Sequence, residues 1–508
     1  MARKNASHFF AIALALGLLP HAANCEVRLP GILSSHMVLQ RERPIHIWGW
    51  SAPGEKVSVS LNGITRSAVS NDLGKWSVYL PPQPAGGPYQ LTVAGTNQIV
   101  LDDVLIGDVW FASGQSNMEM PLKGFPGAPV RNGAEEIAAA NHPQIRLLYI
   151  PQKAADWPLR DAETSWKVCS PETAKDFSAV AYFFGRELNE REKVPIGLID
   201  ASWGGTPVEA WMSLEAIASD AGLMPLFATR AEMMRNQGDM HEIQEMERRA
   251  FRAAREAGKP LPQFPWHPDP ASWKPAALFY GMVAPVVDYP IKGVIWYQGE
   301  SNSRRSFAPL YVKEFPAMIA DWRSQWRQGD FPFLFVQISS FKSNDTEVWP
   351  VIREAQRRTL SVANTAMAVT IDIGDPDNVH PADKQTVGAR LALAARALAY
   401  GEKVEYSGPI FRQAVPEAGA MRVWFDHAAN GISAKGGALQ GFEIAGAGGS
   451  YVPAEARIDG NTVVVSSSQV SQPVRVRYGW ENAPVVNLFN SEGLPASPFT
   501  SESAIPAQ

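Results

Sequence analysis

Short apolar runs alternate with helical segments through the middle of the chain, and this alternation restricts the fold more than any other feature of the sequence. The apolar runs lie at residues 109–112, 145–150, 196–200, 293–297, 333–338 and 366–371. The helical segments lie at residues 179–188, 311–327 and 387–399. Strands that are apolar on both faces belong to parallel sheets that helices cover on both sides. We therefore predict an α/β domain over residues 104–403, with a parallel sheet between two helical layers.

The two flanking regions have a different pattern. In residues 26–103, short strands alternate apolar and polar residues between turn-forming segments, which predicts a small β-sandwich. Residues 404–508 contain further short strands among many glycines and prolines, and we predict a second β domain there. Three domains fit a chain of 508 residues, which is longer than one domain usually is.

Residues 214–259 interrupt the α/β pattern with a charged, methionine-rich and helical sequence. We interpret this segment as a solvated helical hairpin inserted into the 104–403 domain. A lid over a functional site is the alternative interpretation.

Residues 1–25 have the features of a signal peptide. Arg3 and Lys4 precede an apolar run at 9–19, which is too short to cross a bilayer as a helix, and small residues follow it. Cys25 could carry a lipid anchor, but the preceding Ala-Ala-Asn is a poor context for lipidation. We expect a secreted or periplasmic protein with no membrane span. Cleavage near residue 25 would leave Cys169 as the remaining cysteine, so no intramolecular disulfide is expected.

The charge of the chain argues against two classes of partner. The formal net charge is −5 at pH 7, from 46 basic and 51 acidic residues. General binding to nucleic acid or to a membrane surface requires a basic field. We therefore expect no nucleic-acid partner.

A serine follows the first apolar run of the central pattern, in the sequence Gly114-Gln115-Ser116-Asn117-Met118. Sites in parallel sheets form at the carboxyl ends of strands. A helix that starts at Ser116 would offer free backbone N–H groups, which stabilise the oxyanion of acyl transfer. The local sequence differs from the Gly-x-Ser-x-Gly elbow of another hydrolase fold, so a helix cap is an equal interpretation of Ser116.

One histidine has a carboxylate placed to orient it. His380 follows the last apolar run, and Asp377 lies three residues before it. On one loop, this spacing lets the carboxylate accept from one ring nitrogen while the other faces a serine. Asp372 and Asp375 are weaker candidates for the same role. An acidic loop that binds a cation or is merely solvated is the alternative, but Ser116 and His380 together favour a catalytic triad.

Two further strand ends carry candidate oxyanion donors. Gly204 and Gly205 follow the run at 196–200, and glycines let backbone N–H groups approach a ligand. Gln298 or Asn302, after the run at 293–297, could donate a side-chain amide N–H. Glu300 lies between these two amides, and we expect it to form an ion pair with one of the nearby arginines, Arg304 or Arg305.

Six segments together resemble the sialate O-acetylesterase family, a branch of the SGNH hydrolases. They are Met37-Val38-Leu39-Gln40-Arg41, the run from Gly107 to Met118, Trp203-Gly204-Gly205-Thr206, the run from Pro275 to Met282, the run from Trp296 to Asn302, and the run from Asp377 to Pro381. Each segment alone is moderate support, but their order is specific. The resemblance extends over nearly all of the mature chain.

The resemblance implies a three-layer SGNH α/β/α sandwich that removes acetyl groups from sugar hydroxyls without a metal or another cofactor. It implies that Ser116 is the nucleophile, His380 the base and Asp377 its orienting residue. The oxyanion hole would consist of the Ser116 and Gly205 N–H groups and the Gln298 amide. Gln298 stands where the wider superfamily has Asn, which leaves the choice between Gln298 and Asn302 open. The candidate substrate-binding residues are Gln115, Asn117, Trp203, Glu300 and Asn302.

Two other functions fit parts of the sequence. An acetylesterase acting on plant hemicellulose, such as acetylated xylan or xyloglucan, would use the same site. A non-catalytic carbohydrate-binding protein would be built from β domains around an inactive α/β core. The combination of Ser116, His380 and Asp377 argues against this last function.

Overall fold

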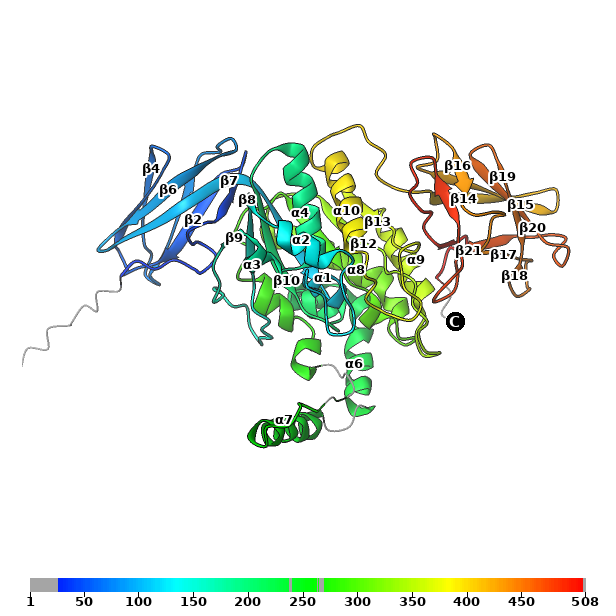
Figure 1. The fold of residues 1–508 in the computed structure, drawn as a ribbon, viewed down its shortest axis with the longest axis horizontal. Coiled ribbons are helices and arrows are strands. Elements are labelled where there is room, and N and C mark those ends of the chain that lie inside the picture. Colours follow the sequence, from blue (N-terminus) through cyan, green and yellow to red (C-terminus); the bar gives the residue numbers. More distant parts are fainter. Residues whose placement is uncertain (1–25, 237–239, 263, 265–268, 506–508) are drawn as a thin grey trace, which may run out of the picture.

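A parallel sheet forms the centre of the molecule in the computed structural model, which describes residues 26–236, 240–262, 264 and 269–505 (Figure 1). In spatial order, the parallel strands are β13 (Thr365–Ala368), β12 (Phe333–Val336), β11 (Gly293–Tyr297), β7 (Gln98–Gly114), β10 (Ile196–Ser202) and β8 (His142–Tyr149). The short strand β9 (Lys167–Cys169) pairs antiparallel with β8 at the edge. The strands are short and apolar because both faces of this sheet are buried.

Helices cover both faces of the sheet. One layer contains α4 (Ala179–Glu192) and α10 (Lys384–Leu398), and the other contains α8 (Tyr311–Trp326) and α9 (Trp349–Thr359). Alternate residues of β7 point to opposite layers: Trp110 packs in the core with α4 and α10, whereas Phe111 packs with Trp322 of α8. The predicted α/β/α sandwich is therefore confirmed.

Strand β7 belongs to two sheets at once. Its first part pairs antiparallel with β6 (Gly86–Ala94), from Gln98 to Ile106. Its last part, from Asp108 to Gly114, pairs parallel with β10 and β11. The chain therefore passes from the N-terminal β region into the central sheet within one strand, with no loop at the predicted boundary near residue 103.

The N-terminal β region contains two sheets. The remaining strands are β1 (Val38–Gln40), β2 (Ile45–Trp50), β3 (Lys56–Leu61), β4 (Ile64–Val69) and β5 (Lys75–Leu80). β2 pairs with β5, while β3 pairs with β4 and β6. Their apolar side chains share one continuous core with α8 and the central sheet, so the N-terminal region packs directly on the α/β unit.

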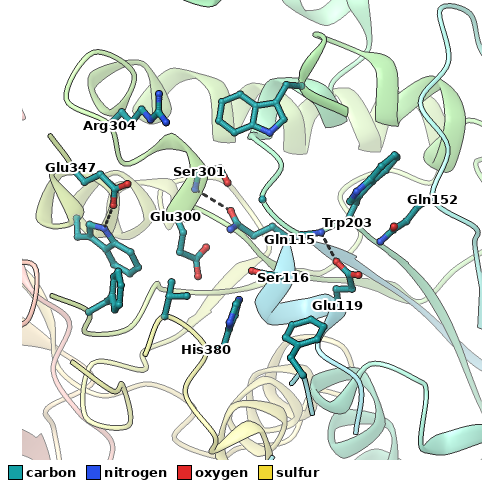
Figure 2. Close-up of a pocket in the computed structure, with 17 residues that line it drawn as sticks. Gln115, Ser116, Glu119, Gln152, Trp203, Glu300, Ser301, Arg304, Glu347 and His380 are labelled. Carbon is teal, nitrogen blue, oxygen red and sulfur yellow. Dashed lines mark hydrogen bonds between the residues drawn. The ribbon is translucent and has the colours of Figure 1, made fainter. Parts of the chain in front are cut away.

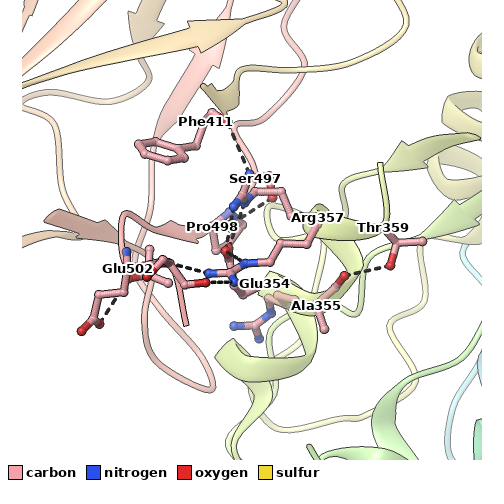
Figure 3. Close-up of polar contacts among 12 residues, drawn as sticks. Glu354, Ala355, Arg357, Thr359, Phe411, Ser497, Pro498 and Glu502 are labelled. Atoms are coloured by element: carbon pink, nitrogen blue, oxygen red, sulfur yellow. Dashed lines mark hydrogen bonds and ion pairs between the residues drawn. The ribbon is translucent and has the colours of Figure 1, made fainter. Parts of the chain in front are cut away.

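The C-terminal β region, from β14 (Ile410–Glu417) to β23 (Phe499–Thr500), is joined to α9. Its first sheet consists of β14, β15 (Ala420–Asp426), β20 (Thr462–Ser466) and β19 (Glu455–Asp459). Its second sheet consists of β18 (Val452–Pro453), β17 (Phe442–Ala445), β21 (Arg475–Tyr478) and β23. The strands β16 (Ile432–Ala434) and β22 (Leu488–Asn490) form a separate pair. Arg357 of α9 donates to the carbonyl of Phe411, and Arg358 donates to that of Glu502 (Figure 3). Both arginines also donate to the fully buried carboxylate of Glu354, which fixes their direction.

The segment predicted to be an inserted hairpin is helical. It contains α5 (Leu214–Ser219), α6 (Pro225–Asn236) and α7 (Met240–Glu256), and α7 lies well away from the central sheet (Figure 1). Within the described ranges, no helix is long and apolar enough to cross a membrane. The predicted signal peptide and Cys25 lie outside the described residues. Cys169, in contrast, is a buried free thiol.

Candidate active site

Three strand ends meet at Gly114, the last residue of β7. Gly114 pairs with Ser202 on one side and with Tyr297 on the other. A Cβ atom at this position would lie 2.1 Å from the Tyr297 carbonyl oxygen, and the backbone φ is 141°, so the turn requires glycine. The loops that follow β10 and β11 are therefore held on either side of Ser116.

Ser116 is the first residue of the short helix α1 (Ser116–Glu119), not its cap. Gln115 occupies the N-cap position and makes no side-chain capping bond. The Ser116 hydroxyl is therefore not used to cap the helix, which removes the alternative interpretation of this residue. Its backbone N–H has no acceptor among the residues described, as expected for the first turn of a helix.

A pocket of about 640 Å³ lies over Ser116 (Figure 2). Both Ser116 and His380 line it, together with Gln115, Trp203, Gly205 and Glu300. The structure thus brings together residues from the ends of β7, β10, β11 and β13, as the sequence predicted for the carboxyl edge of a parallel sheet.

His380 enters this pocket on the loop between β13 and α10. Its ring packs edge-on against Phe125, with ring centroids 5.3 Å apart. Burial, with a smaller contribution from the charge of Lys384, lowers the pKa of the His380 imidazole to about 4. The ring is therefore neutral at pH 7 and able to accept a proton. The His380 backbone N–H donates to Asn378 Oδ1 at 2.9 Å, whereas the two ring nitrogens make no hydrogen bond within the described part of the chain.

The hydrogen bond predicted between Asp377 and His380 is not formed in this structure. The Asp377 side chain is 81% exposed, and its Oδ1 lies 3.1 Å from Lys342 Nζ. The Asp377 backbone N–H donates to the Asp375 carboxylate, which directs the loop outward. Asp372, the other weaker candidate, pairs with Arg390.

Glu300 does not form the expected ion pair with Arg304 or Arg305. Its side chain turns into the pocket instead, is 8% exposed, and accepts a hydrogen bond from Asn117 Nδ2 at 2.7 Å. Its second oxygen, Oε2, is buried without a partner in the described structure. Burial raises the pKa of the Glu300 carboxyl group. The expectation was wrong because the turn after Gly299 directs Glu300 inward, while Arg304 remains on the exposed side.

Asn117 connects Glu300 to the loop of His380. Its Nδ2 also donates to the Val379 carbonyl at 3.0 Å, and its Oδ1 accepts from the fully buried Lys384 at 2.5 Å. Burial lowers the pKa of the Lys384 ammonium to about 7. Sequence reasoning did not identify Lys384, because a lysine at the start of an amphipathic helix is normally exposed.

The structure places the Gln298 and Asn302 amides outside the pocket. Both side chains are fully buried, and Gln298 Nε2 donates to the Thr206 carbonyl at 3.2 Å and to Asn302 Oδ1 at 2.7 Å. Asn302 Nδ2 donates to Glu209 at 3.0 Å. Because these N–H groups are used inside the protein, neither amide supplies a donor to the pocket in this structure.

Gln115 and Gln152 are the glutamines that line the pocket, and Gln152 Nε2 donates to the Ser202 carbonyl at 3.2 Å. Gln115 Oε1 accepts from the Ser301 N–H at 3.2 Å and more weakly from the Gly299 N–H at 3.4 Å. Two backbone donors on one oxygen fix the orientation of the amide. Gln115 Nε2 is therefore the free end, with no acceptor among the described side chains and carbonyls.

The loop after β10 packs directly against Ser116. A Cβ atom on Gly204 would lie 3.2 Å from Ser116 Cβ, and the Gly204 N–H donates to Glu119 of α1. Gly205 has a φ of 71°, and its N–H has no acceptor in the described structure. Glu119 was not predicted, although its position one helical turn after Ser116 places it on the same side of α1.

Comparisons with known proteins agree on one family. A family model described as "Carbohydrate esterase, sialic acid-specific acetylesterase" matches residues 271–397. Human sialate O-acetylesterase is 33% identical over 432 residues, which cover 77% of this chain and 74% of the human protein. The chain belongs to the sialate O-acetylesterase family. The mouse member is 30% identical over 97% of this chain and 98% of its own length.

A solved structure resembles this chain over nearly its whole fold. The crystal structure of a carbohydrate acetylesterase from Xanthomonas citri matches with a TM-score of 0.81 and 38% identity, over 94% of this chain and 100% of that one. The chain is thus a carboxylic ester hydrolase of the sialate O-acetylesterase family.

Proposed function

We propose that this chain is a secreted serine esterase that removes O-acetyl groups from sugars. The observation that supports this proposal is that one pocket brings together three kinds of group. They are the Ser116 hydroxyl, which does not cap a helix, the neutral ring of His380, and the backbone N–H groups of Ser116 and Gly205, which have no acceptors in the described structure. The named relatives are sialate O-acetylesterases and a carbohydrate acetylesterase, which agrees with an acetylated sugar as substrate. The predicted signal peptide would direct the enzyme out of the cytoplasm.

The proposed mechanism has two acyl-transfer steps. Ser116 Oγ attacks the acetyl carbonyl carbon while His380 takes the hydroxyl proton. The negative charge that develops on the carbonyl oxygen accepts hydrogen bonds from the Ser116 and Gly205 N–H groups. The C–O bond to the sugar breaks, and His380 donates its proton to the sugar oxygen. Water, deprotonated by His380, then attacks the acetyl-enzyme and releases acetate.

Asp377 is proposed to orient His380 during this reaction. Such a role requires Asp377 to leave Lys342 and turn toward the ring. Both partners of that ion pair are exposed, at 81% and 66%, and an exposed pair of this kind contributes at most about 1 kcal/mol. Asp377 can therefore leave Lys342 at low cost and pair with the His380 imidazolium that forms in the transition state. Catalytic hydrogen bonds of this kind often tighten only when substrate is bound.

The side-chain donor to the substrate is proposed to be Gln115 rather than Gln298 or Asn302. Gln115 Nε2 is free and lines the pocket, whereas the amide N–H groups of the other two are used within the protein. Glu300 Oε2 offers an acceptor in the same pocket for a sugar hydroxyl.

The charge of the pocket favours a second candidate substrate class, the acetylated neutral hemicelluloses. Three carboxyl groups line the pocket, from Glu119, Glu300 and Glu347, and Arg304 is the lining guanidinium. A sialate carries a carboxylate, which these carboxyl groups repel wherever they are ionised and which Arg304 would attract. Neutral acetylated xylan or xyloglucan carries no such charge.

Acetate release by wild type and Ser116→Ala tests the proposed function. The substrates are p-nitrophenyl acetate, O-acetylated sialic acids and acetylated hemicellulose oligosaccharides. We expect Ser116→Ala to lower kcat at least about 10⁴-fold, because the nucleophile and base act as a unit. Equal rates for the two proteins would reject the serine mechanism, and release from p-nitrophenyl acetate without release from any sugar would reject the substrate class.

A further inference from the structure

A second groove, with a volume of about 850 Å³, lies between the N-terminal β region and the α/β unit. We propose that it binds a neutral oligosaccharide chain, the same chain whose acetyl group is removed at Ser116. The proposal of a shared chain rests on the proposed function, whereas the binding of sugar in the groove can be measured without catalysis.

One wall of the groove is an aromatic face of β2 and β5, formed by His46, Trp48, Trp50 and Tyr79. The register pairs His46 with Tyr79, and paired residues of neighbouring strands point to the same side of a sheet. The His46 ring is stacked on that of Tyr79, with centroids 4.3 Å apart and planes at 4°, and on that of Trp48 at 4.8 Å. Tyr79 nevertheless remains 58% exposed. Exposed aromatic rings with a polar group are typical of binding surfaces, because they give contact area together with a hydrogen bond.

The opposite wall comes from the α/β unit. It contains Phe279 and Tyr280, at the start of the π-helical turn η4 (Phe279–Val283), and the loop 158–160. The Leu159 N–H donates to the Tyr280 carbonyl at 2.9 Å, which fixes the loop on this wall. The groove is therefore preformed and lies between two structural units, as is usual for ligand sites.

The polar groups of the groove match an uncharged ligand that has hydroxyl groups. Its charged lining residues balance, with Lys75 and Arg160 against Glu215 and Asp288. Burial lowers the pKa of His46, so its ring is neutral at pH 7. A ligand with a net charge would therefore gain no general attraction here.

One buried nitrogen on the aromatic face has no partner among the described residues. It is Nε2 of His46, whose residue is 8% exposed. His46 Nδ1 lies 3.0 Å from the Asp288 carbonyl, which can only accept, so Nδ1 carries the proton and Nε2 is an acceptor. A sugar hydroxyl can donate a hydrogen bond to such an acceptor.

One segment connects the groove to the catalytic pocket. Gln152 lines the pocket over Ser116, and Leu159 lines the groove. Their Cα atoms can be at most about 25 Å apart, because a fully extended chain spans no more than about 3.6 Å per residue. Trp157 lies on this segment and is 68% exposed. The oligosaccharide that we propose would extend from the aromatic face past Trp157 to the pocket.

The groove is tested with Tyr79→Ala and Trp157→Ala, because both side chains are exposed and their removal leaves the core intact. Phe227→Ala, another exposed aromatic but on α6, is the matched control. Steady-state kinetics compare p-nitrophenyl acetate with acetylated xylan oligosaccharides. We expect KM for the oligosaccharide to rise about tenfold in each groove variant, which corresponds to about 1.4 kcal/mol. Values of kcat/KM for p-nitrophenyl acetate should equal those of wild type and the control.

Calorimetry separates this inference from the proposed function. Unacetylated xylan and cellulose oligosaccharides are titrated into the Ser116→Ala protein, with and without Tyr79→Ala. Binding that Tyr79→Ala weakens supports the groove even if no acetylated sugar is a substrate. The proposal is overturned if neither oligosaccharide binds, or if affinity and KM are the same with and without Tyr79.

Discussion

Asn117 Nδ2 donates a hydrogen bond to Glu300 Oε1 over 2.7 Å, although 183 positions separate the two residues in the sequence. The same amide group also reaches the Val379 carbonyl, next to His380, and the Lys384 ammonium. The residue that follows the proposed nucleophile therefore fixes both the carboxyl group of Glu300 in the pocket and the loop that carries His380.

Glu300→Gln should weaken binding of the sugar without impairing the acyl-transfer chemistry. The variant keeps the shape of the side chain but replaces one carboxyl oxygen with an amide NH₂ group. We expect KM for an acetylated sugar to rise about tenfold, because removing one partner of a buried hydrogen bond costs about 1–3 kcal/mol. Steady-state kinetics on p-nitrophenyl acetate should show a wild-type kcat, and the exposed Glu492→Gln should leave both substrates unaffected. A large loss of kcat on p-nitrophenyl acetate would instead assign Glu300 to the chemical step.

Lys384→Met should shift the pH dependence of kcat/KM. In the proposed mechanism His380 acts as a base in its neutral form, so activity is expected to fall as pH decreases through the His380 pKa of about 4. The Lys384 pKa is about 7, so its ammonium is charged across this acid range, where it opposes protonation of the ring. Removal of that charge raises the His380 pKa, and the acid limb of the kcat/KM profile moves to higher pH.

The matched control for this shift is Lys342→Met. Lys342 is exposed and contacts Asp377 instead of the buried network. Its replacement should leave the acid limb in place. An unchanged limb in Lys384→Met, or an equal shift in both variants, would show that the charge of Lys384 does not act on His380.

Asp377→Asn tests the proposed orienting role against the position of Asp377 in the structure. If Asp377 turns to His380 during the reaction, kcat should fall by about 10³–10⁴-fold, as expected when an orienting carboxylate becomes an amide. Asp375→Asn, on the same exposed loop, should retain most of the wild-type kcat. If kcat of Asp377→Asn lies within about threefold of wild type, Ser116 and His380 work without this carboxylate. Loss of an orienting carboxylate would lower kcat far more than that.

The central fold was predictable because burial on both faces leaves a direct pattern in the sequence. Residues 333–336 and 293–297 are apolar throughout, and both runs are strands of the parallel sheet. The meeting of Ser116 and His380 followed from the rule that strand ends share one edge. The helix α9 was not predicted, although its residues include many that pack in the core.

Side-chain directions in the loops were not predictable, because a loop has no fixed period. Gln298 and Glu300 are two residues apart, yet the first side chain points into the protein and the second into the pocket. Gly299 lies between them with a φ of 151°, a backbone conformation that favours glycine and that turns the chain between the two side chains. The burial of Lys384 depends equally on a distant partner, Asn117, which no local pattern identifies.

The continuity of β7 determines how this protein can be divided. A cut near residue 103 would fall inside a strand, separating the half that pairs with β6 from the half that leads to Ser116. The N-terminal β region is therefore not a detachable module that could be exchanged or deleted by recombination at that point. A fragment that keeps the whole of β7 keeps Ser116 together with the strand that lies in the N-terminal β region, so the proposed nucleophile and that region share one structural element.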